Sequence, residues 1–321
     1  MAMDLSNIPD LGSRQLLAVL AIADYGSFIA AAAFLKTSQP ALTRTIKRIE
    51  DVLGMSLFER TTRRVQLTPA GREFIAVAER VLNDLRISVR GMRELADQQR
   101  GQVILASIIA SNQLPRIVAE YHIAKPAIEL HVREGVHGAV LDDVRSGIAD
   151  LGITYTDELP DTVAMVPLGR EVLHAVLPRQ HRLARLRRVT LKQIAREPLV
   201  SLPTDSRTRR LIDAAASRQG ITLQRAVIAN QVATVMSLVR AGLGVAIMPE
   251  GAIAGFNTDG LATLPITGPT LSLNLGLVTL KEREPTPAAR GIAMLIRAVW
   301  STTRGLMPEQ KYSLISLFSI A

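Results

Sequence analysis

Three side chains of the types that read DNA bases lie close together near the N-terminus. Gln39, Thr43 and Arg44 carry amide, hydroxyl and guanidinium groups, all of which can hydrogen-bond to base edges in the major groove. Residues four apart share one face of a helix. If this segment is helical, the pattern predicts a surface that recognises double-stranded DNA.

The helix that would position these side chains is well marked. Ser38 stands where an N-cap belongs, and Pro40 falls in the first turn, where a missing N–H has no cost. Lys47 lies on the same exposed face, whereas Arg48 and Asp51 are expected to be solvated charges. The opposite face steps by four, three and four residues, which predicts one buried stripe. The residues of this stripe are Leu42, Ile46, Ile49 and Leu53.

A second helix is expected directly upstream, from Phe28 to Lys36, with Ser27 before it. Its run of alanines from Ala30 to Ala33 permits close approach to a neighbouring helix. The connection to the next helix is only Thr37 and Ser38. Two helices joined by so tight a turn are typical of a helix-turn-helix, whose second helix enters the major groove.

The residues after the recognition helix, which carries Gln39, Thr43 and Arg44, predict a small hairpin from Leu57 to Leu67 with a basic tip. Such a wing would hold Arg63 and Arg64 near phosphates or the minor groove, where they add salt-sensitive affinity. The alternative is a solvated charged turn. We favour the wing because it directly follows a helix-turn-helix pattern.

Together these residues resemble the LysR-type transcriptional regulators. The similar stretches are Phe28-Ile-Ala-Ala-Ala-Ala-Phe-Leu, Ser38-Gln-Pro-Ala-Leu-Thr-Arg, Leu57-Phe-Glu-Arg, Leu67-Thr-Pro-Ala-Gly, Asp150-Leu-Gly-Ile and Leu238-Val-Arg-Ala-Gly-Leu-Gly-Val-Ala-Ile-Met-Pro. The resemblance covers roughly residues 11–300. It implies that bases or phosphates are contacted by Gln39, Pro40, Thr43 and Arg44, that Arg63 and Arg64 make wing contacts, and that Ser27 touches phosphate.

A long helix is expected to begin at Thr68 and Pro69 and to continue to about Gln98. Its apolar positions alternate steps of three and four residues, as in a coiled-coil seam. The seam comprises Ile75, Ala78, Leu82, Leu85, Val89, Met92 and Ala96. We expect it to form a homodimer that sets two recognition helices on a promoter inverted repeat; packing against the C-terminal domain is the alternative. The resemblance implies a tetramer that is a dimer of dimers.

After Gly101 the pattern changes to short Val- and Ile-rich runs separated by helical stretches, which predicts α/β units with a largely parallel sheet. The expected strands are Val103 to Ser107, Ile128 to Glu134, Asp150 to Thr154, Val172 to Leu177, Leu199 to Leu202, Arg225 to Ala229, Val245 to Met248 and Leu273 to Thr279. The expected helices are Leu114 to His122, Ala139 to Ser146, Ser206 to Gln219 and Val232 to Ala241.

The family resembles periplasmic binding proteins in this region, which implies two subdomains with a small-molecule effector between them. Ligands in such folds bind beyond the carboxyl ends of strands, near helix N-termini that favour anions. The candidate pocket residues are Ser107, Ser111, His137 (or Val136), Thr204, Ser206 and Arg207. If the effector is a carboxylate, Arg207 would bind it through charge-assisted hydrogen bonds. Each hydroxyl residue alone could equally be a simple N-cap.

Composition excludes several other functions. The chain has 321 residues, a net charge of +9 and no cysteine, so it has no thiolate nucleophile or thiolate metal site. The histidines lack metal-ligand spacing, and Gly242-Leu-Gly lacks the rest of a dinucleotide fingerprint. We therefore expect no enzyme, no metal and no cofactor other than an effector. The arginines from Arg179 to Arg188 fit a solvated loop or a second anionic surface.

The solute-binding proteins of transport systems are a competing class, but the N-terminal winged helix and the lack of a secretory signal at the start argue against it. No apolar run approaches the ~18 residues of a membrane span, so we expect a cytoplasmic protein. As a transcription regulator, it is also expected to contact RNA polymerase. The expected fold is multidomain α and α/β. Its parts are a winged helix-turn-helix at 1–68, a linker and dimerisation helix at 69–100, an effector domain at 101–304 (subdomain I about 102–170 and 270–300, subdomain II about 171–269) and a tail at 305–321.

Overall fold

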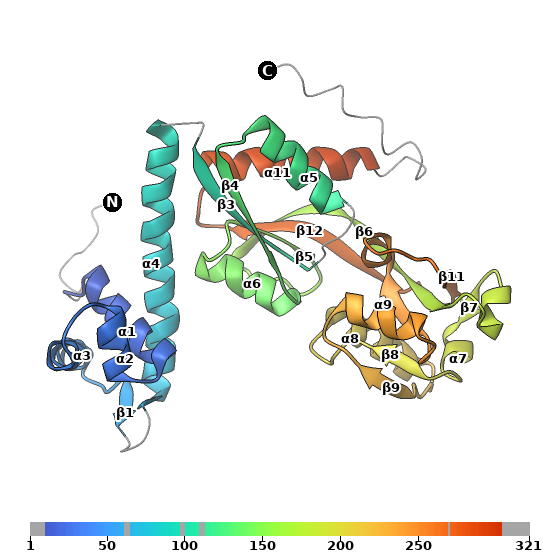
Figure 1. The fold of residues 1–321 in the computed structure, drawn as a ribbon, viewed down its shortest axis with the longest axis horizontal. Helices are drawn as coiled ribbons and strands as arrows, with labels where there is room; N and C mark the ends of the chain where they lie inside the picture. Colours follow the sequence, from blue (N-terminus) through green and yellow to red (C-terminus); the bar gives the residue numbers. More distant parts are fainter. Residues whose placement is uncertain (1–9, 61–64, 97–99, 109–112, 269, 304–321) are drawn as a thin grey trace. The chain divides into compact units, whose positions relative to one another are not determined.

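The computed structural model describes residues 10–60, 65–96, 100–108, 113–268 and 270–303. The chain divides into two compact units, Met1–Arg90 and Gly91–Ala321, each with its own core. Among the described residues the first unit is mostly helical and the second is an α/β fold (Figure 1).

The first unit packs three helices around a small apolar core. These are α1 (Ser13–Tyr25), α2 (Phe28–Phe34) and α3 (Gln39–Leu53). The hydroxyl groups of Ser27 and Ser38 cap α2 and α3, accepting from the backbone N–H groups of Ala30 and Ala41 at 3.3 Å. The α3 residues predicted for the stripe are buried or half-buried in the core formed by the three helices and the hairpin.

A two-stranded hairpin follows α3, as predicted. Strands β1 (Phe58–Arg60) and β2 (Val65–Leu67) pair antiparallel, with Phe58 opposite Leu67. Gly54 ends α3 with a φ of 68°, a left-handed conformation that glycine adopts without strain. The hairpin is fixed to α3 by Glu50, whose Oε1 accepts from the N–H groups of Leu57 at 2.7 Å and Phe58 at 3.4 Å.

The long helix α4 (Pro69–Ala96) begins where the sequence predicts. Thr68 holds its start in place, because its Oγ1 donates to the carbonyl of Ser56 at 2.7 Å and accepts from the N–H of Gly71 at 2.9 Å. A side chain on Gly71 would put a Cβ 2.1 Å from the carbonyl oxygen of Leu57, so glycine allows α4 to pass directly over the hairpin.

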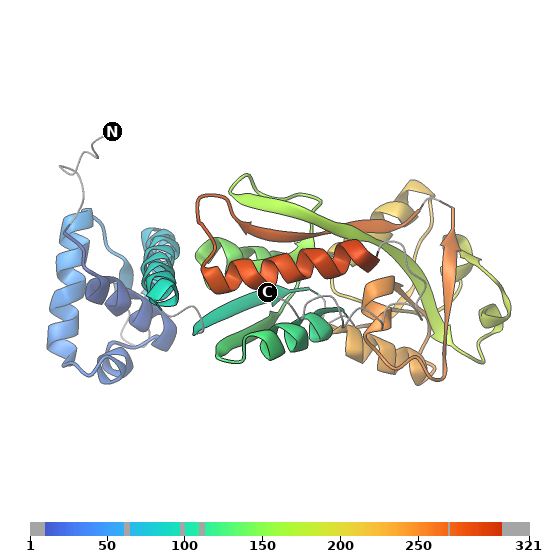
Figure 2. The same ribbon diagram turned by 90° about the horizontal axis from the view of Figure 1, so that it is seen from above.

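The first half of the second unit is a sheet covered by helices on both faces (Figures 1 and 2). Strands β3 (Gly101–Ser107), β4 (Ile128–Glu134) and β5 (Leu151–Tyr155) run parallel, with β3 in the middle. Helices α5 (Gln113–Ala124) and α11 (Pro287–Thr303) pack together on one face, and α6 (His137–Ser146) covers the other. Residues of β3 alternate between these two cores.

Two long strands connect this half of the unit to the second half. Strand β6 (Val163–Pro178) pairs antiparallel first with β12 (Ser272–Leu280) and then, past Val172, with β10 (Ala246–Pro249) and β11 (Leu261–Thr267). Strand β12 returns and pairs antiparallel with β5. The chain therefore passes out along β6 and back along β12, the crossing expected of two subdomains (Figure 1).

The second half is built around the far end of β6. Strand β7 (Val189–Thr190) pairs with β11, and β8 (Leu199–Ser201) pairs in parallel with β9 (Arg225–Ile228). The helical segments here are η1 (Arg182–Arg185), α7 (Leu191–Ile194), α8 (Arg207–Arg218), α9 (Val232–Arg240) and α10 (Glu250–Ala254).

The expected strands and helices of the second unit are all present with ends shifted by a few residues, apart from the strand expected from Val172 to Leu177. That segment is the last part of β6, which begins at Val163. The expectation of a largely parallel sheet is wrong: β6 pairs antiparallel with each of its neighbours and β12 with both of its own, so the sheet is mixed. Helix α11 and strand β11 were not predicted. The sequence pattern shows where strands occur but not their direction, which depends on how the chain crosses between subdomains.

Candidate functional site

The exposed face of α3 presents the side chains predicted to meet DNA. Gln39, Pro40, Arg44 and Lys47 are exposed, and Thr43 is half-buried. These residues lie opposite the buried stripe, whose Ile46 and Ile49 are fully covered. Arg48, by contrast, is paired with Asp10 at 3.3 Å. The geometry leaves the basic face of α3 available to a polyanion.

The other predicted DNA contacts are only partly located. Ser27 is half-buried, and its Oγ accepts the N-cap hydrogen bond of α2. The hydroxyl hydrogen can therefore still be donated to another acceptor, such as a phosphate oxygen. Arg63 and Arg64 lie outside the described residues. The last described pair of the β1–β2 hairpin before these residues is Arg60 with Val65.

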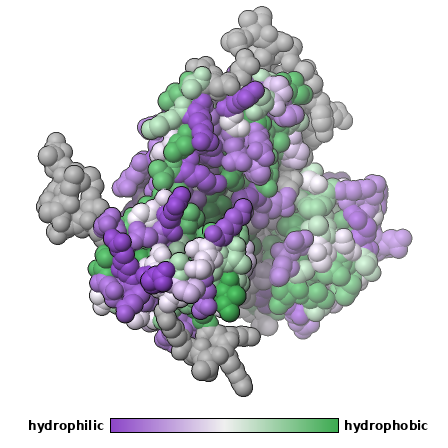
Figure 3. Space-filling view, turned by 60° about the vertical axis from the view of Figure 1, so that its left-hand side comes forward, coloured by the Kyte–Doolittle hydropathy of each residue, from purple (hydrophilic) through white to green (hydrophobic). Residues whose placement is uncertain are grey.

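The predicted dimer seam divides into two parts along α4. At the start of the helix, Ala78 is fully buried within one chain and Ile75 packs on the core of the first unit. Farther along, large apolar side chains are exposed. These side chains, the α4 stripe, are Val77, Val81, Leu85, Val89, Met92 and Leu95. Ala96 is also exposed, and Leu82 is half-buried. In Figure 3 apolar side chains are exposed among hydrophilic ones on the face shown.

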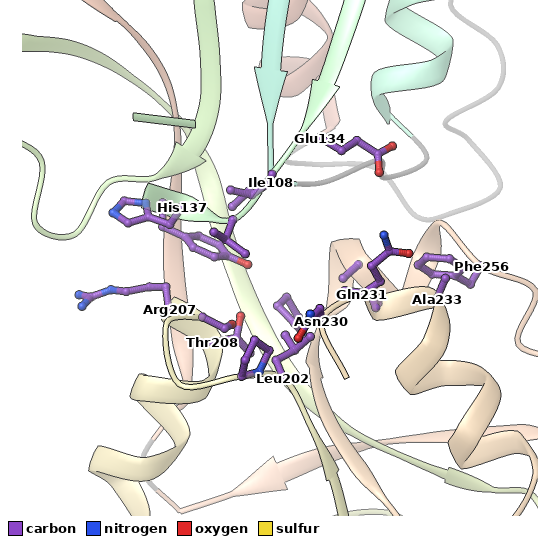
Figure 4. A pocket seen from close by; sticks show the side chains of 18 residues that line it. Ile108, Glu134, His137, Leu202, Arg207, Thr208, Asn230, Gln231, Ala233 and Phe256 are labelled. Carbon is purple, nitrogen blue, oxygen red and sulfur yellow. The ribbon is translucent and has the colours of Figure 1, made fainter. Parts of the chain in front are cut away.

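In the second unit a cavity of about 360 Å³ lies between the two halves (Figure 4). It is lined at the carboxyl ends of strands from both halves. Ile108 and Tyr155 follow or end β3 and β5, while Leu202 and Asn230 follow β8 and β9. The walls are mostly apolar, with Phe256 and Val232 among them.

The structure brings some of the predicted effector residues to this cavity and not others. His137, Ser206 and Arg207 line it. Ser107 does not: it is the last residue of β3 and is completely buried, and its carbonyl accepts from the N–H of Gly135 at 3.1 Å. Thr204 is exposed and is not among the lining residues. Ser111 lies outside the described residues.

Three helices begin at the cavity, and this governs its electrostatics. The N-termini of α6, α8 and α9 contribute lining residues, and none of the three has a side-chain N-cap hydrogen bond or an acidic residue in its first turn. The first N–H groups of a helix have no intrahelical acceptor and carry the positive end of its dipole. These three helix ends favour a negatively charged group, whereas the carboxylate of Glu134, which also lines the cavity, opposes one.

His137, the first residue of α6, contributes a polar but uncharged wall. Its Nδ1 lies 2.8 Å from Oγ1 of Thr154, and both side chains are buried. Burial, with Arg207 and Arg210 nearby, lowers the pKa of His137 from its ordinary value of 6.5. The imidazole is therefore neutral at pH 7 and can donate or accept one hydrogen bond.

Two polar contacts connect the two halves across the cavity. Nη1 of Arg207 on α8 lies 2.6 Å from Oε1 of Glu158, which follows β5; this guanidinium lowers the pKa of the Glu158 carboxyl. Tyr155 hydrogen-bonds to Thr208, and burial raises the pKa of its phenol, which stays protonated. In Figure 4 Arg207 extends away from the centre of the cavity.

Comparison with known proteins identifies the family. Residues 13–72 match the model of the bacterial regulatory helix-turn-helix protein, lysR family, and residues 96–301 match that of the LysR substrate binding domain. The chain belongs to the LysR-type transcriptional regulator family. It is a DNA-binding transcription regulator with an effector-binding domain, not an enzyme.

Individual LysR-type relatives agree with this assignment. The uncharacterized HTH-type transcriptional regulator YbhD of Escherichia coli (strain K12) is 27% identical over 286 residues, which is 88% of this chain and 90% of the relative. The structure of full-length CbnR with its target DNA has a TM-score of 0.67 and 22% identity, covering 90% of this chain and 99% of CbnR. The effector binding domain of QuiR in complex with shikimate has a TM-score of 0.57 and 19% identity, covering 63% of this chain and 98% of QuiR.

Several residues around the cavity of this LysR-type regulator were missed from sequence. Asn230 and Gln231 lie between β9 and α9, and Tyr155 ends β5. The rule that ligands bind beyond strand ends would have selected them had it been applied to every strand. Phe256 carries no comparable signal, because it follows the short helix α10 and reaches the cavity only through packing.

A buried guanidinium holds one wall of the cleft in this regulator. Arg209 on α8 is 7% exposed; its Nη1 donates to Oγ of Ser201 at 3.1 Å and to the carbonyl of Leu202 at 2.9 Å, and its Nε donates to Asp213 at 2.6 Å. These bonds satisfy the buried charge and attach the start of α8 to the end of β8.

Among the described residues, no helix has the length and hydropathy of a membrane span.

Proposed function

We propose that the regulator works as a homodimer, assembled further into a dimer of dimers, which binds a promoter inverted repeat and responds to a small carboxylate. The carboxylate would bind in the 360 Å³ cavity of the effector-binding domain. Its contacts would alter how paired subunits present their recognition helices to DNA and how the complex contacts RNA polymerase. A protein that acts on bacterial DNA would do so in the cytoplasm.

The observation that carries the effector class is the convergence of three uncapped helix N-termini on one cavity. Backbone N–H groups at helix N-termini bind carboxylates without a charged side chain. Arg207 at the start of α8 adds a guanidinium close by, and the protonated phenol of Tyr155 adds a donor. The apolar walls would cover the rest of the ligand.

The effector binding domain of QuiR has been solved in complex with shikimate, a carboxylate, which gives a carboxylate effector a precedent in this fold. At 19% identity the likeness extends to the fold alone, and the proposal of a carboxylate rests on the cavity itself. The cavity volume of about 360 Å³ falls within the range common for small-molecule binding sites.

The dimer rests on the α4 stripe. Exposed apolar side chains that recur every three or four residues form a surface that a second helix can cover. Two copies related by a two-fold axis would bring two recognition helices to half-sites about one turn of DNA or a multiple apart.

The test is fluorescence anisotropy with the intergenic DNA beside the regulator's own gene, at several salt concentrations. Arg44→Ala should abolish sequence-specific binding, while Arg218→Ala, an exposed arginine of the effector-binding domain, should not change it. Binding no tighter than to random DNA would refute the operator assignment.

The effector is tested separately by a thermal-shift panel of small carboxylates with matched amides. A carboxylate that raises the melting temperature while its amide does not would support the cavity's anion preference. Replacing Val232 by tryptophan should remove that shift, because Val232 lines the cavity. A panel in which amides bind as well as carboxylates would contradict it.

A further inference from the structure

A second cavity, of about 590 Å³, lies elsewhere in the second unit, on the face of the sheet covered by α5 and α11. It shares no lining residue with the cavity between the two halves. Its apolar floor comes from four strands, β4, β5, β6 and β12, and from α11. Ile128, Leu151, Val166, Leu277, Ala288 and Met294 belong to this floor.

The polar residues that line this groove are mostly cations. Arg100, Lys125, Arg290 and Arg297 line it, and all are exposed. Arg290 and Arg297 are seven residues apart on α11, so they lie on one face of the helix about 10 Å apart along its axis. Within the described part of the chain, no ion pair joins Lys125, Arg290 or Arg297 to an acid.

One acid, Glu94, lines the groove, and backbone N–H groups donate hydrogen bonds to its carboxylate. Glu94 is 2% exposed; its Oε1 accepts from the N–H of Gln102 at 3.4 Å and its Oε2 accepts from the N–H of Ala288 at 3.1 Å. The neighbouring Tyr121 hydroxyl donates to the carbonyl of Ala288 at 2.8 Å. Both carboxylate oxygens of Glu94 thus accept from backbone amides, while Lys125, Arg290 and Arg297 lie exposed at the edge of the groove.

We propose that this groove binds an amphipathic organic anion: an apolar body against the floor and a carboxylate or sulfonate against Arg290 and Arg297. The apolar floor would cover the apolar body of such a ligand, and the positively charged side chains at the edge would bind its anionic group. A volume of 590 Å³ accommodates a small organic molecule. The ligand would touch Glu94 and Leu95, which belong to the last turn of α4, the same helix that begins in the DNA-binding unit.

Octanoate is a suitable probe, with octanamide as its uncharged equivalent, and isothermal titration calorimetry of the full chain gives affinity and stoichiometry. We expect octanoate to bind and octanamide to bind at least fivefold more weakly. The double variant Arg290→Gln, Arg297→Gln should weaken octanoate about five- to tenfold, as expected for two partly screened charges. Arg185→Gln and Arg187→Gln together, both exposed and far from the groove in sequence, should have no effect.

Val232→Trp separates the two sites, because it obstructs the cavity between the subdomains and leaves the groove intact. Octanoate binding that survives Val232→Trp and is lost in the arginine double variant supports the groove. Binding that is lost only in Val232→Trp, or that has the same affinity in the arginine double variant as in the wild type, overturns the proposal. Binding that appears only after residues 304–321 are removed would make the chain's own tail the occupant and would also overturn it.

Discussion

Arg207 and Glu158 form an ion pair at 2.6 Å that joins α8 to the loop after β5, across the effector cleft. Glu158 adopts a left-handed φ of 69°, which is uncommon for a residue with a side chain. The side chain of Glu158 is largely exposed and that of Arg207 is not, with exposed fractions of 68% and 17%. An internal carboxylate therefore occupies the guanidinium that the proposed effector would use.

We expect Glu158→Gln to bind the carboxylate effector about two- to fivefold more tightly, because an ion pair whose carboxylate is largely exposed is worth little but must be broken first. Glutamine keeps the size and the backbone strain and removes only the charge. Asp161→Asn, in the same loop, is the control and should bind as the wild type does. Calorimetry with the carboxylate found by the thermal-shift panel measures this, and unchanged affinity in Glu158→Gln would mean that Glu158 does not compete.

Glu171 should make stability depend on pH. Burial raises the pKa of its carboxyl above the ordinary 4.5, although the N–H of Gly251 donates to Oε2 at 2.6 Å. The unfolded chain therefore releases this proton at a lower pH than the folded chain does. As a result the free energy of unfolding falls as the pH rises above about 4.5. The loss is complete once the pH exceeds the pKa of Glu171 in the folded chain. Glu171→Gln should melt at a higher temperature than wild type at pH 7 and at a similar one near pH 4.

Thermal melts of Glu171→Gln across that range test the sign directly. Gln keeps an oxygen that can accept from Gly251, so packing is retained. Glu250→Gln is a useful comparison, because that neighbouring carboxylate also raises the pKa of Glu171. A Glu171→Gln variant that is less stable than wild type at pH 7 would show that the carboxylate is a net stabilising group.

Glu50 should be needed to hold the hairpin against α3. Its Oε1 accepts from two backbone N–H groups, and both Leu57 and Phe58 are buried. Glu50→Ala would leave these donors without a partner, at a cost of about 1–3 kcal/mol. Glu50→Gln retains an acceptor oxygen and should lose less. Chemical denaturation gives the free energy of unfolding, and equal losses for the two variants would rule out the hydrogen bonds as the cause.

Leu85→Glu should break the dimer. Leu85 is 52% exposed in the middle of the α4 stripe, so a charge there would be buried if two copies pair. Ala76, nine residues earlier, is exposed two and a half turns away and therefore on the opposite face. Analytical ultracentrifugation should show monomers for Leu85→Glu and wild-type assembly for Ala76→Glu. If Leu85→Glu still sediments as wild type does, the stripe is not the seam.

The DNA-binding unit could be predicted from sequence in some detail. Ser38, Pro40 and the four-three-four stripe define α3, because caps and helical periodicity depend on residues close together in the chain. The same local signals placed most strands and helices of the effector-binding domain. They also placed Ser206 and Arg207 at the start of a helix and His137 at the end of a strand, and all three line one cavity.

Contacts between distant segments were decided by the tertiary structure alone. Ser107 ends β3 and Thr204 follows β8, and both have suitable residue types, yet Ser107 is buried and Thr204 faces solvent. The pairing of Arg207 with Glu158, and the arrival of Phe256 at the cavity, depend on how β6 and β12 cross between the subdomains. Local propensity determines where a helix begins, whereas which side chains meet is determined by packing, and one sequence pattern is compatible with many packings.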